Sequence, residues 1–86
     1  MEKFQYTITD ELGIHARPAG MLVRLCMSFK SNLTLTNQDG TTASLKRIFT
    51  VMGLSVKCGD TVIVTADGED EKAALETVKQ HFSAYL

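Results

Sequence analysis

The segment GIHARPAG, residues 13–20, concentrates the residues of this chain that could do chemistry. It contains one of the two histidines, an arginine two positions later and the only proline, and its other residues are Gly, Ala and Ile. A neutral imidazole is a nucleophile that can carry a covalently bound group. A guanidinium is a planar cation that suits phosphate oxygens. The pairing of His15 with Arg17 therefore favours phosphoryl chemistry.

The residues that follow His15 predict the start of a helix. Pro18 fits a first helical turn, where its missing N–H costs little, and it also restricts the backbone of Arg17. The first amide N–H groups of a helix have no partner within the helix, and together with the helix dipole they form an anion site. We therefore interpret this segment as a place where a phosphoryl group is taken onto the ring and held. Small residues leave room for a large partner group to approach: Ala16, Ala19 and Gly20.

Other kinds of site find less support around His15. A single histidine before a helix is commonly a surface residue or a weak cap, so the residue type alone does not decide its role. Neither His81 nor the two cysteines have the spacing to His15 that metal ligands require, so we predict no metal site and no cofactor. The chain contains no Ser or Cys nucleophile motif and no glycine-rich nucleotide loop. With no second catalytic group near His15, we do not expect a stand-alone enzyme.

Length and composition limit the function classes further. The 86 residues suit one small domain, 1–86, with 44% hydrophobic residues, 22% charged residues and a net charge of −1. Phosphate backbones are held by excess Lys and Arg, so nucleic acid is not the expected partner. No apolar run is long enough for a membrane span, and the N-terminal residues alternate as in a strand rather than forming a signal peptide. We expect a cytoplasmic protein whose Cys26 and Cys58 are reduced.

Hydrophobic periodicity predicts an α+β fold. Apolar alternation indicates strands over 2–9, 32–37, 41–44 and 61–66, with a hairpin turn at 37–40. Helical spacing indicates helices over 16–29, 45–52 and 67–86. The order β-α-β-β-α-β-α predicts an antiparallel sheet with the helices packed on one face. Which strands neighbour each other in the sheet, beyond the hairpin, does not follow from this pattern.

The same spacing predicts which helical residues are buried. The first helix should bury a stripe made of Ala16, Ala19, Leu22, Val23, Cys26 and Phe29. The last helix should bury Ala74, Leu75, Val78, Phe82 and Tyr85. We expect His81 to be a surface side chain. The acidic residues at 67–71 suit a solvated helix start better than a cation site.

Three segments of the chain, LGIHARPAG, ASLKRIFTVMGL and VIVTADGEDEKAALETV, resemble the HPr family, the histidine-containing phosphocarriers of the bacterial sugar phosphotransferase system. The similarity extends along the whole chain, and the His-x-Arg-Pro-Ala motif is highly specific in this context. The resemblance implies an open-faced β-sandwich, with a four-stranded antiparallel sheet in the order 1-4-2-3 and three helices on one face.

The resemblance also implies a function and a site. His15 would accept a phosphoryl group on Nδ1 from enzyme I, which takes it from phosphoenolpyruvate, and would pass it to sugar-specific IIA components. Arg17, together with the backbone amides of Ala16 and Arg17, would hold the group. A monomeric carrier would dock its partners through an apolar patch and the adjacent helix face: Ala16, Gly20, Arg24, Ile48, Phe49 and Met52.

One position departs from the pattern of many Gram-positive members of the family. Arg47 stands where those members have a serine that a dedicated kinase phosphorylates, so kinase control at this site is in doubt. A specialised paralogue that serves a nitrogen-related or other regulatory phosphorelay is the alternative within the family. From a different class, the alternative is a small α+β ligand- or RNA-binding module that is not phosphorylated, and the near-neutral charge and the lack of stacking aromatic residues count against RNA.

Overall fold

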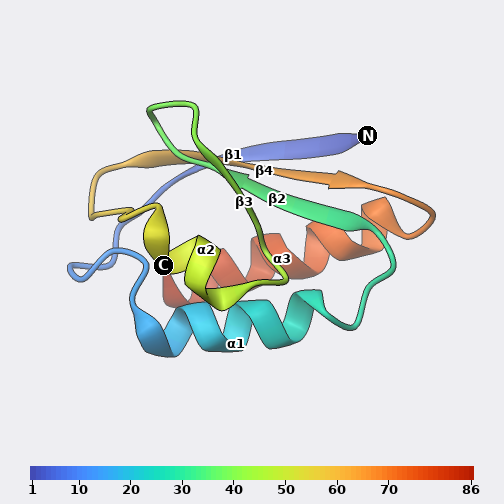
Figure 1. Cartoon of the computed structure of the whole chain (residues 1–86), viewed down its shortest axis with the longest axis horizontal. Helices are drawn as coiled ribbons and strands as arrows, with labels where there is room; N and C mark the ends of the chain where they lie inside the picture. The colour runs from blue at the N-terminus through green and yellow to red at the C-terminus, as the bar shows by residue number, and fades with distance from the viewer.

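Four strands and three helices follow one another in the predicted order β-α-β-β-α-β-α (Figure 1). The computed structural model describes residues 1–86. The strands are β1 (Glu2–Thr7), β2 (Asn32–Thr36), β3 (Thr42–Ser44) and β4 (Thr61–Asp67). The helices are α1 (Ala16–Cys26), α2 (Ile48–Gly53) and α3 (Glu71–Tyr85). None of the three is both long enough and apolar enough to cross a membrane.

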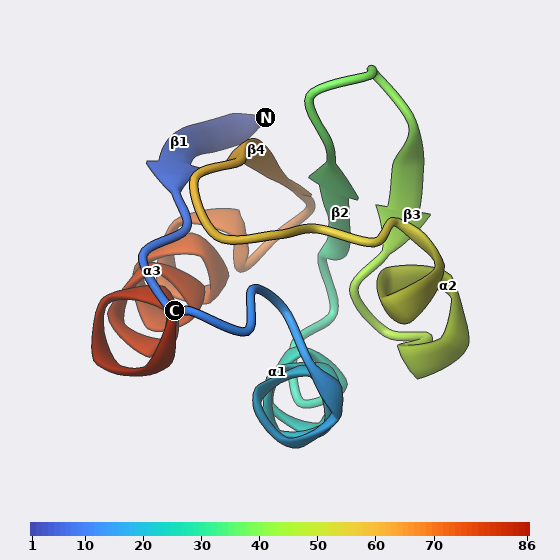
Figure 2. The ribbon, with the colours of Figure 1, turned by 90° about the vertical axis from the view of Figure 1, so that its left-hand side faces the viewer.

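The strands form one antiparallel sheet in the order β1-β4-β2-β3, which confirms the order that the family resemblance implied. In the β1–β4 pair Phe4 lies opposite Val64, and in the β2–β4 pair Leu35 lies opposite the same Val64. The end-on view in Figure 2 shows all three helices below the sheet, with α1 between α3 and α2. The other face of the sheet carries no helix, so the sandwich is open, as expected.

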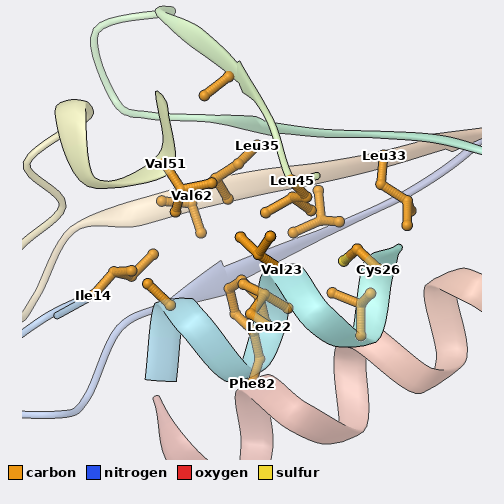
Figure 3. Packing of buried hydrophobic residues seen from close by; sticks show 14 of the residues in the cluster. Ile14, Leu22, Val23, Cys26, Leu33, Leu35, Leu45, Val51, Val62 and Phe82 are labelled. Carbon is orange, nitrogen blue, oxygen red and sulfur yellow. The ribbon is translucent and has the colours of Figure 1, made fainter. Parts of the chain in front are cut away.

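The core fills the space between the sheet and the helices (Figure 3). Alternation along β4 buries Val62, Val64 and Ala66 and leaves the residues between them partly or fully exposed. Phe82 of α3 is fully buried, and the rings of Phe4 and Tyr6 meet it edge to face with centroids 5.7 and 5.4 Å away. This packing fixes α3 beneath the β1 edge of the sheet.

The helix α1 ends three residues earlier than predicted. Beyond Cys26 the chain forms a turn, in which the amides of Ser28 and Phe29 donate to the carbonyls of Leu25 and Cys26 at 3.2 Å each. Phe29 still packs against the core, but from this turn rather than from the helix. The Lys46 ammonium donates to the Phe29 carbonyl at 2.7 Å, so a tertiary contact holds the turn that the apolar spacing predicted as helix.

The predicted buried stripes are wrong at two helix ends. Ala16, the first residue of α1, and Tyr85, the last residue of α3, are both exposed, and Leu75 is only half-buried. The other predicted members within the two helices are buried: Ala19, Leu22, Val23, Cys26, Ala74, Val78 and Phe82. Helical spacing identifies one face of a helix, but the first and last turns project past the elements that cover that face.

Asp70 is a structural clamp rather than part of a solvated helix start. Its carboxylate accepts hydrogen bonds from the backbone amides of Lys30 and Ser31, at 2.9 Å each, and from the Ser31 hydroxyl. The hydroxyl of Ser31, followed by the amide of Lys30, lowers the pKa of Asp70 to about 2. The carboxylate therefore joins the start of α3 to the turn that leads into β2.

Candidate functional site

His15 occupies the residue immediately before α1. Its backbone is extended, with φ −114° and ψ 177°, and its carbonyl accepts the amide of Ala19 at 2.9 Å. No side chain caps the helix, and its first turn contains no acidic residue. The His15 side chain is 33% exposed, so a partner can reach the ring. The structure thus places a reachable imidazole beside the uncapped positive end of a helix.

The loop before His15 is held tightly against the rest of the fold. Gly13 has φ +67°, and a Cβ at this residue would lie 2.3 Å from the Val56 carbonyl oxygen, so only glycine fits. The Gly13 amide donates to the Asp10 carbonyl at 2.9 Å, and the amide of buried Ile14 donates to the Val56 carbonyl at 3.1 Å. These contacts fix the direction in which the chain enters α1.

A shallow hollow at this end of α1 brings the site residues together. His15 and the exposed Arg17 both line it, as the sequence predicts. Asp10, Pro18, Met21 and Tyr85 complete the lining. An anion in this hollow would meet the guanidinium and the free amides of the first turn. The arrangement therefore suits a phosphoryl group attached to the ring.

Two lining residues were not anticipated from the sequence. Asp10 lies in the loop between β1 and α1, and its Oδ1 atom is 3.9 Å from Nε2 of His15. The only sequence signal for this contact is an acidic residue five positions before the histidine. The direction of a side chain in a loop does not follow from its position in the sequence. Tyr85 comes from the opposite end of the chain, which reaches the hollow because the Leu86 carbonyl accepts the amides of Thr9 and Asp10.

His81 is buried, and the expectation of a surface side chain is wrong. It is 8% exposed, its Nε2 atom lies 3.3 Å from the Pro18 carbonyl oxygen, and its ring centroid lies 4.9 Å from that of Tyr85. Burial lowers its pKa, and the hydrogen bond to Pro18 opposes that effect. His81 therefore supports the first turn of α1 from behind.

The residues of the expected docking patch lie on α1 and α2. Phe49 is 88% exposed, whereas Ile48 and Met52 are half-buried against the core. The two helices meet where Gly20 faces Ile48, since a Cβ on Gly20 would lie 3.7 Å from the Ile48 Cδ1 atom. The remaining members of the set, Ala16 and Arg24, are exposed on α1. Arg47 is exposed directly before α2 and caps nothing with its side chain.

Comparison with known proteins identifies the family. The family model described as "PTS HPr component phosphorylation site" matches residues 2–84. The chain belongs to the HPr family. HPr proteins are the phosphocarriers of the phosphotransferase system.

Individual HPr relatives agree with this assignment. The chain is 42% identical over 79 residues to the phosphocarrier protein HPr of Mycoplasma genitalium, covering 92% of this chain and 90% of that protein. The structure of a Mycoplasma histidine-containing phosphocarrier protein matches with a TM-score of 0.90 at 38% identity, over 93% of this chain and 90% of that one. Crh, a catabolite repression protein of Bacillus subtilis described as a domain-swapped dimer, matches with a TM-score of 0.78 at 31% identity, over 100% and 98% of the two chains.

Proposed function

We propose that the chain is a phosphocarrier that receives a phosphoryl group on His15 from enzyme I and delivers it to IIA components of sugar transporters. The Nδ1 lone pair attacks phosphorus, and the bond between phosphorus and the donor nitrogen of enzyme I breaks. In the second step a histidine of the IIA component attacks the same phosphorus, and the electrons of the N–P bond return to Nδ1. The chain ends each cycle unchanged and without a cofactor.

One observation carries this proposal: the His15 ring is partly exposed at the uncapped N-terminus of α1. The amides of Ala16 and Arg17 belong to the first turn, where a helix has no acceptors of its own. Charge-assisted hydrogen bonds from these donors and from the Arg17 guanidinium would hold the phosphoryl oxygens. The second histidine, His81, is buried and turned toward a carbonyl, so it is not a competing acceptor.

The docking surface that we propose for both partners is the docking patch on α1 and α2. Phe49 projects from α2 into solvent, and exposed large apolar side chains beside a site favour an interaction surface. Ala16, Gly20 and Arg24 extend this surface along α1, and the half-buried Ile48 and Met52 pack against the core. We further propose that the chain acts as a cytoplasmic monomer whose single domain spans 1–86.

Labelling tests the transfer directly. The chain is incubated with enzyme I and ³²P-labelled phosphoenolpyruvate, alongside the variants His15→Ala and His81→Gln, and each labelled protein is then mixed with a sugar-specific IIA component. We expect one acid-labile phosphate on the natural chain and on His81→Gln, none on His15→Ala, and loss of the label to IIA. Undiminished labelling of His15→Ala would refute the proposal.

The transfer step to the IIA component distinguishes the general sugar carrier from a specialised regulatory paralogue of the same family. Crh is a structural neighbour of this chain, and its name refers to catabolite repression. A chain that accepts the label from enzyme I but delivers it to no sugar-specific IIA component would be a specialised regulatory paralogue. Delivery to IIA would establish the general carrier.

Regulation by serine phosphorylation is not part of this proposal. The residue before α2 is Arg47, and the nearby Ser44 hydroxyl accepts the Lys46 amide at 3.2 Å. We expect no phosphate at this site after treatment with the family's regulatory kinase and ATP, as measured by mass spectrometry. Stoichiometric phosphate on Ser44 would show that the site of kinase regulation lies three residues before Arg47 in this chain.

A further inference from the structure

Asp10 is held through both its side chain and its backbone in the loop before His15. Its Oδ1 atom accepts the backbone amide of Leu12 at 2.9 Å, which closes a turn of the kind that Asp and Asn form with the residue two positions later. Its own amide donates to the Leu86 carbonyl at 3.0 Å, and its carbonyl accepts the Gly13 amide at 2.9 Å. Both the backbone and the carboxylate of Asp10 are therefore oriented before any partner binds.

The oriented carboxylate faces one particular nitrogen of the His15 ring. The distance from Oδ1 to Nε2 is 3.9 Å, and the two side chains are 31% and 33% exposed. This distance is too long for a direct hydrogen bond, so the contact is electrostatic and partly screened by water. A carboxylate can only accept protons in hydrogen bonds, and it favours the imidazole tautomer whose N–H lies on its own side.

We propose that Asp10 is a positioning residue that holds the neutral His15 ring in the tautomer protonated at Nε2, so that the Nδ1 lone pair is free for phosphorus. This inference rests on the proposed function and adds a reason for the choice of nitrogen. Attack by Nδ1 forms the N–P bond while the donor's bond to phosphorus breaks, and the proton on Nε2 stays in place. The ring then carries a positive charge opposite the carboxylate.

The same contact serves the return step. When a partner nucleophile takes the phosphoryl group, the electrons of the N–P bond return to Nδ1, and the ring leaves as neutral imidazole with its proton still on Nε2. No proton has to enter or leave the site in either direction. Asp10 would thus keep one tautomer through the whole cycle.

The variant Asp10→Asn tests this role, because asparagine can keep the turn to Leu12 while it removes the charge. The matched control is Glu11→Gln, which removes an equal charge from an adjacent exposed side chain that forms no ion pair with His15. Nitrogen-15 NMR of the ring at pH 8 reports the proton at each nitrogen without any phosphorylation. We expect the ratio of the two tautomers to fall about two- to fivefold in Asp10→Asn, the size of a partly exposed charge contact. Glu11→Gln should match the natural chain, and Asp10→Glu should restore part of the ratio.

Phosphorylation kinetics complete the test. We expect enzyme I to label Asp10→Asn about two- to fivefold more slowly than Glu11→Gln, with amide spectra that show both variants folded. An unchanged tautomer ratio in Asp10→Asn would overturn the role of Asp10. Failure of the natural chain to accept any label would overturn the proposed function instead, and the tautomer measurement keeps the two failures apart.

Discussion

Two residues of the same type have opposite environments in this chain. His15 stands 33% exposed before α1, next to the carboxylate of Asp10, whereas His81 is 8% exposed and directs Nε2 at the Pro18 carbonyl. Reactivity at the residue scale therefore follows from access and from neighbours, since the two rings are chemically identical. The same argument applies to Arg17, whose exposed guanidinium lines the hollow beside His15.

Arg17 should matter to transfer and little to folding. Hydrogen bonds from a charged group to phosphate contribute about 1.5–3 kcal/mol, so Arg17→Ala should slow phosphorylation by enzyme I about tenfold or more. Its melting temperature should stay close to that of the natural chain, because the side chain is exposed. Rapid-quench labelling and a melting curve measure the two effects. Arg17→Lys, which keeps the charge and loses the planar fork, should be intermediate. A large drop in melting temperature with unaltered transfer would contradict this role.

His81 should make folding stability depend on pH in mildly acidic solution. Its pKa in the folded chain lies below its ordinary value of 6.5, so the unfolded chain binds the proton more readily. The contribution of His81 to stability is therefore complete above about pH 6.5 and decreases as the pH falls from there toward the folded pKa. Urea unfolding between pH 5 and pH 8 should show this loss, and His81→Gln should lack it. An identical pH profile for both chains would contradict the prediction.

At the scale of elements, α1 and α3 run side by side beneath the sheet with opposite directions (Figure 1). This arrangement brings the end of α3 to the start of α1, where Tyr85 lines the hollow and His81 supports the first turn. At the other end, Asp70 fastens the start of α3 to the turn after α1. The two helices are therefore connected at both ends, and the functional end is held by packing as well as by hydrogen bonds.

Gly20 allows a test of stability at the junction of α1 and α2. It lies inside α1, where glycine costs about 0.5–1 kcal/mol relative to alanine. A Cβ would meet only the Ile48 Cδ1 atom, at an ordinary contact distance of 3.7 Å. Gly20→Ala should therefore raise the melting temperature by about 2–8 °C, measured by circular dichroism. A lower melting temperature would mean that the junction of α1 and α2 cannot accept a methyl group.

Asp70→Asn should weaken the chain at neutral pH and much less in acid. The folded pKa of about 2 lies below the ordinary 3.8, so the carboxylate stabilises the fold fully above about pH 4, and this contribution is lost as the pH falls through 2. Urea unfolding should show a gap between the two chains at pH 7 that narrows steadily below pH 4. The control is Glu69→Gln, because Glu69 is 85% exposed and lies 3.9 Å from an equally exposed Lys30. A pH-independent gap would contradict the clamp.

At the scale of the whole molecule, a carrier has to present one histidine to two different proteins and then leave each of them. The hollow at His15 is shallow and open at one end of the sandwich, and the exposed Phe49 projects from α2 on the helical side. A small contact area suits short-lived association. The three helices thus cover the core and also carry the proposed docking surface. The opposite face of the sheet contributes to neither.

Phe49→Glu should weaken binding to enzyme I and to the IIA component together, by about tenfold or more if Phe49 anchors the interface. Its melting temperature should change little, because the ring is 88% exposed. Leu22→Glu is the contrasting variant, since Leu22 is fully buried and a charge there should unfold the chain. Titration of each partner followed by amide chemical shifts measures the binding. Unchanged affinity for both partners would remove Phe49 from the docking surface.

The sequence by itself determined the features that depend on local pattern. Element order and the position of His15 before α1 follow from spacing over a few residues, and the family resemblance supplied the strand order. Tertiary structure alone decided the end of α1, the burial of His81 and the meeting of Asp10 with His15 and Tyr85. Those features depend on contacts such as that between the Leu86 carbonyl and the Thr9 amide, which join residues from opposite ends of the chain. Hydrophobic periodicity cannot predict such contacts, because it indicates which face of a helix or strand is apolar but not which other residues pack against that face.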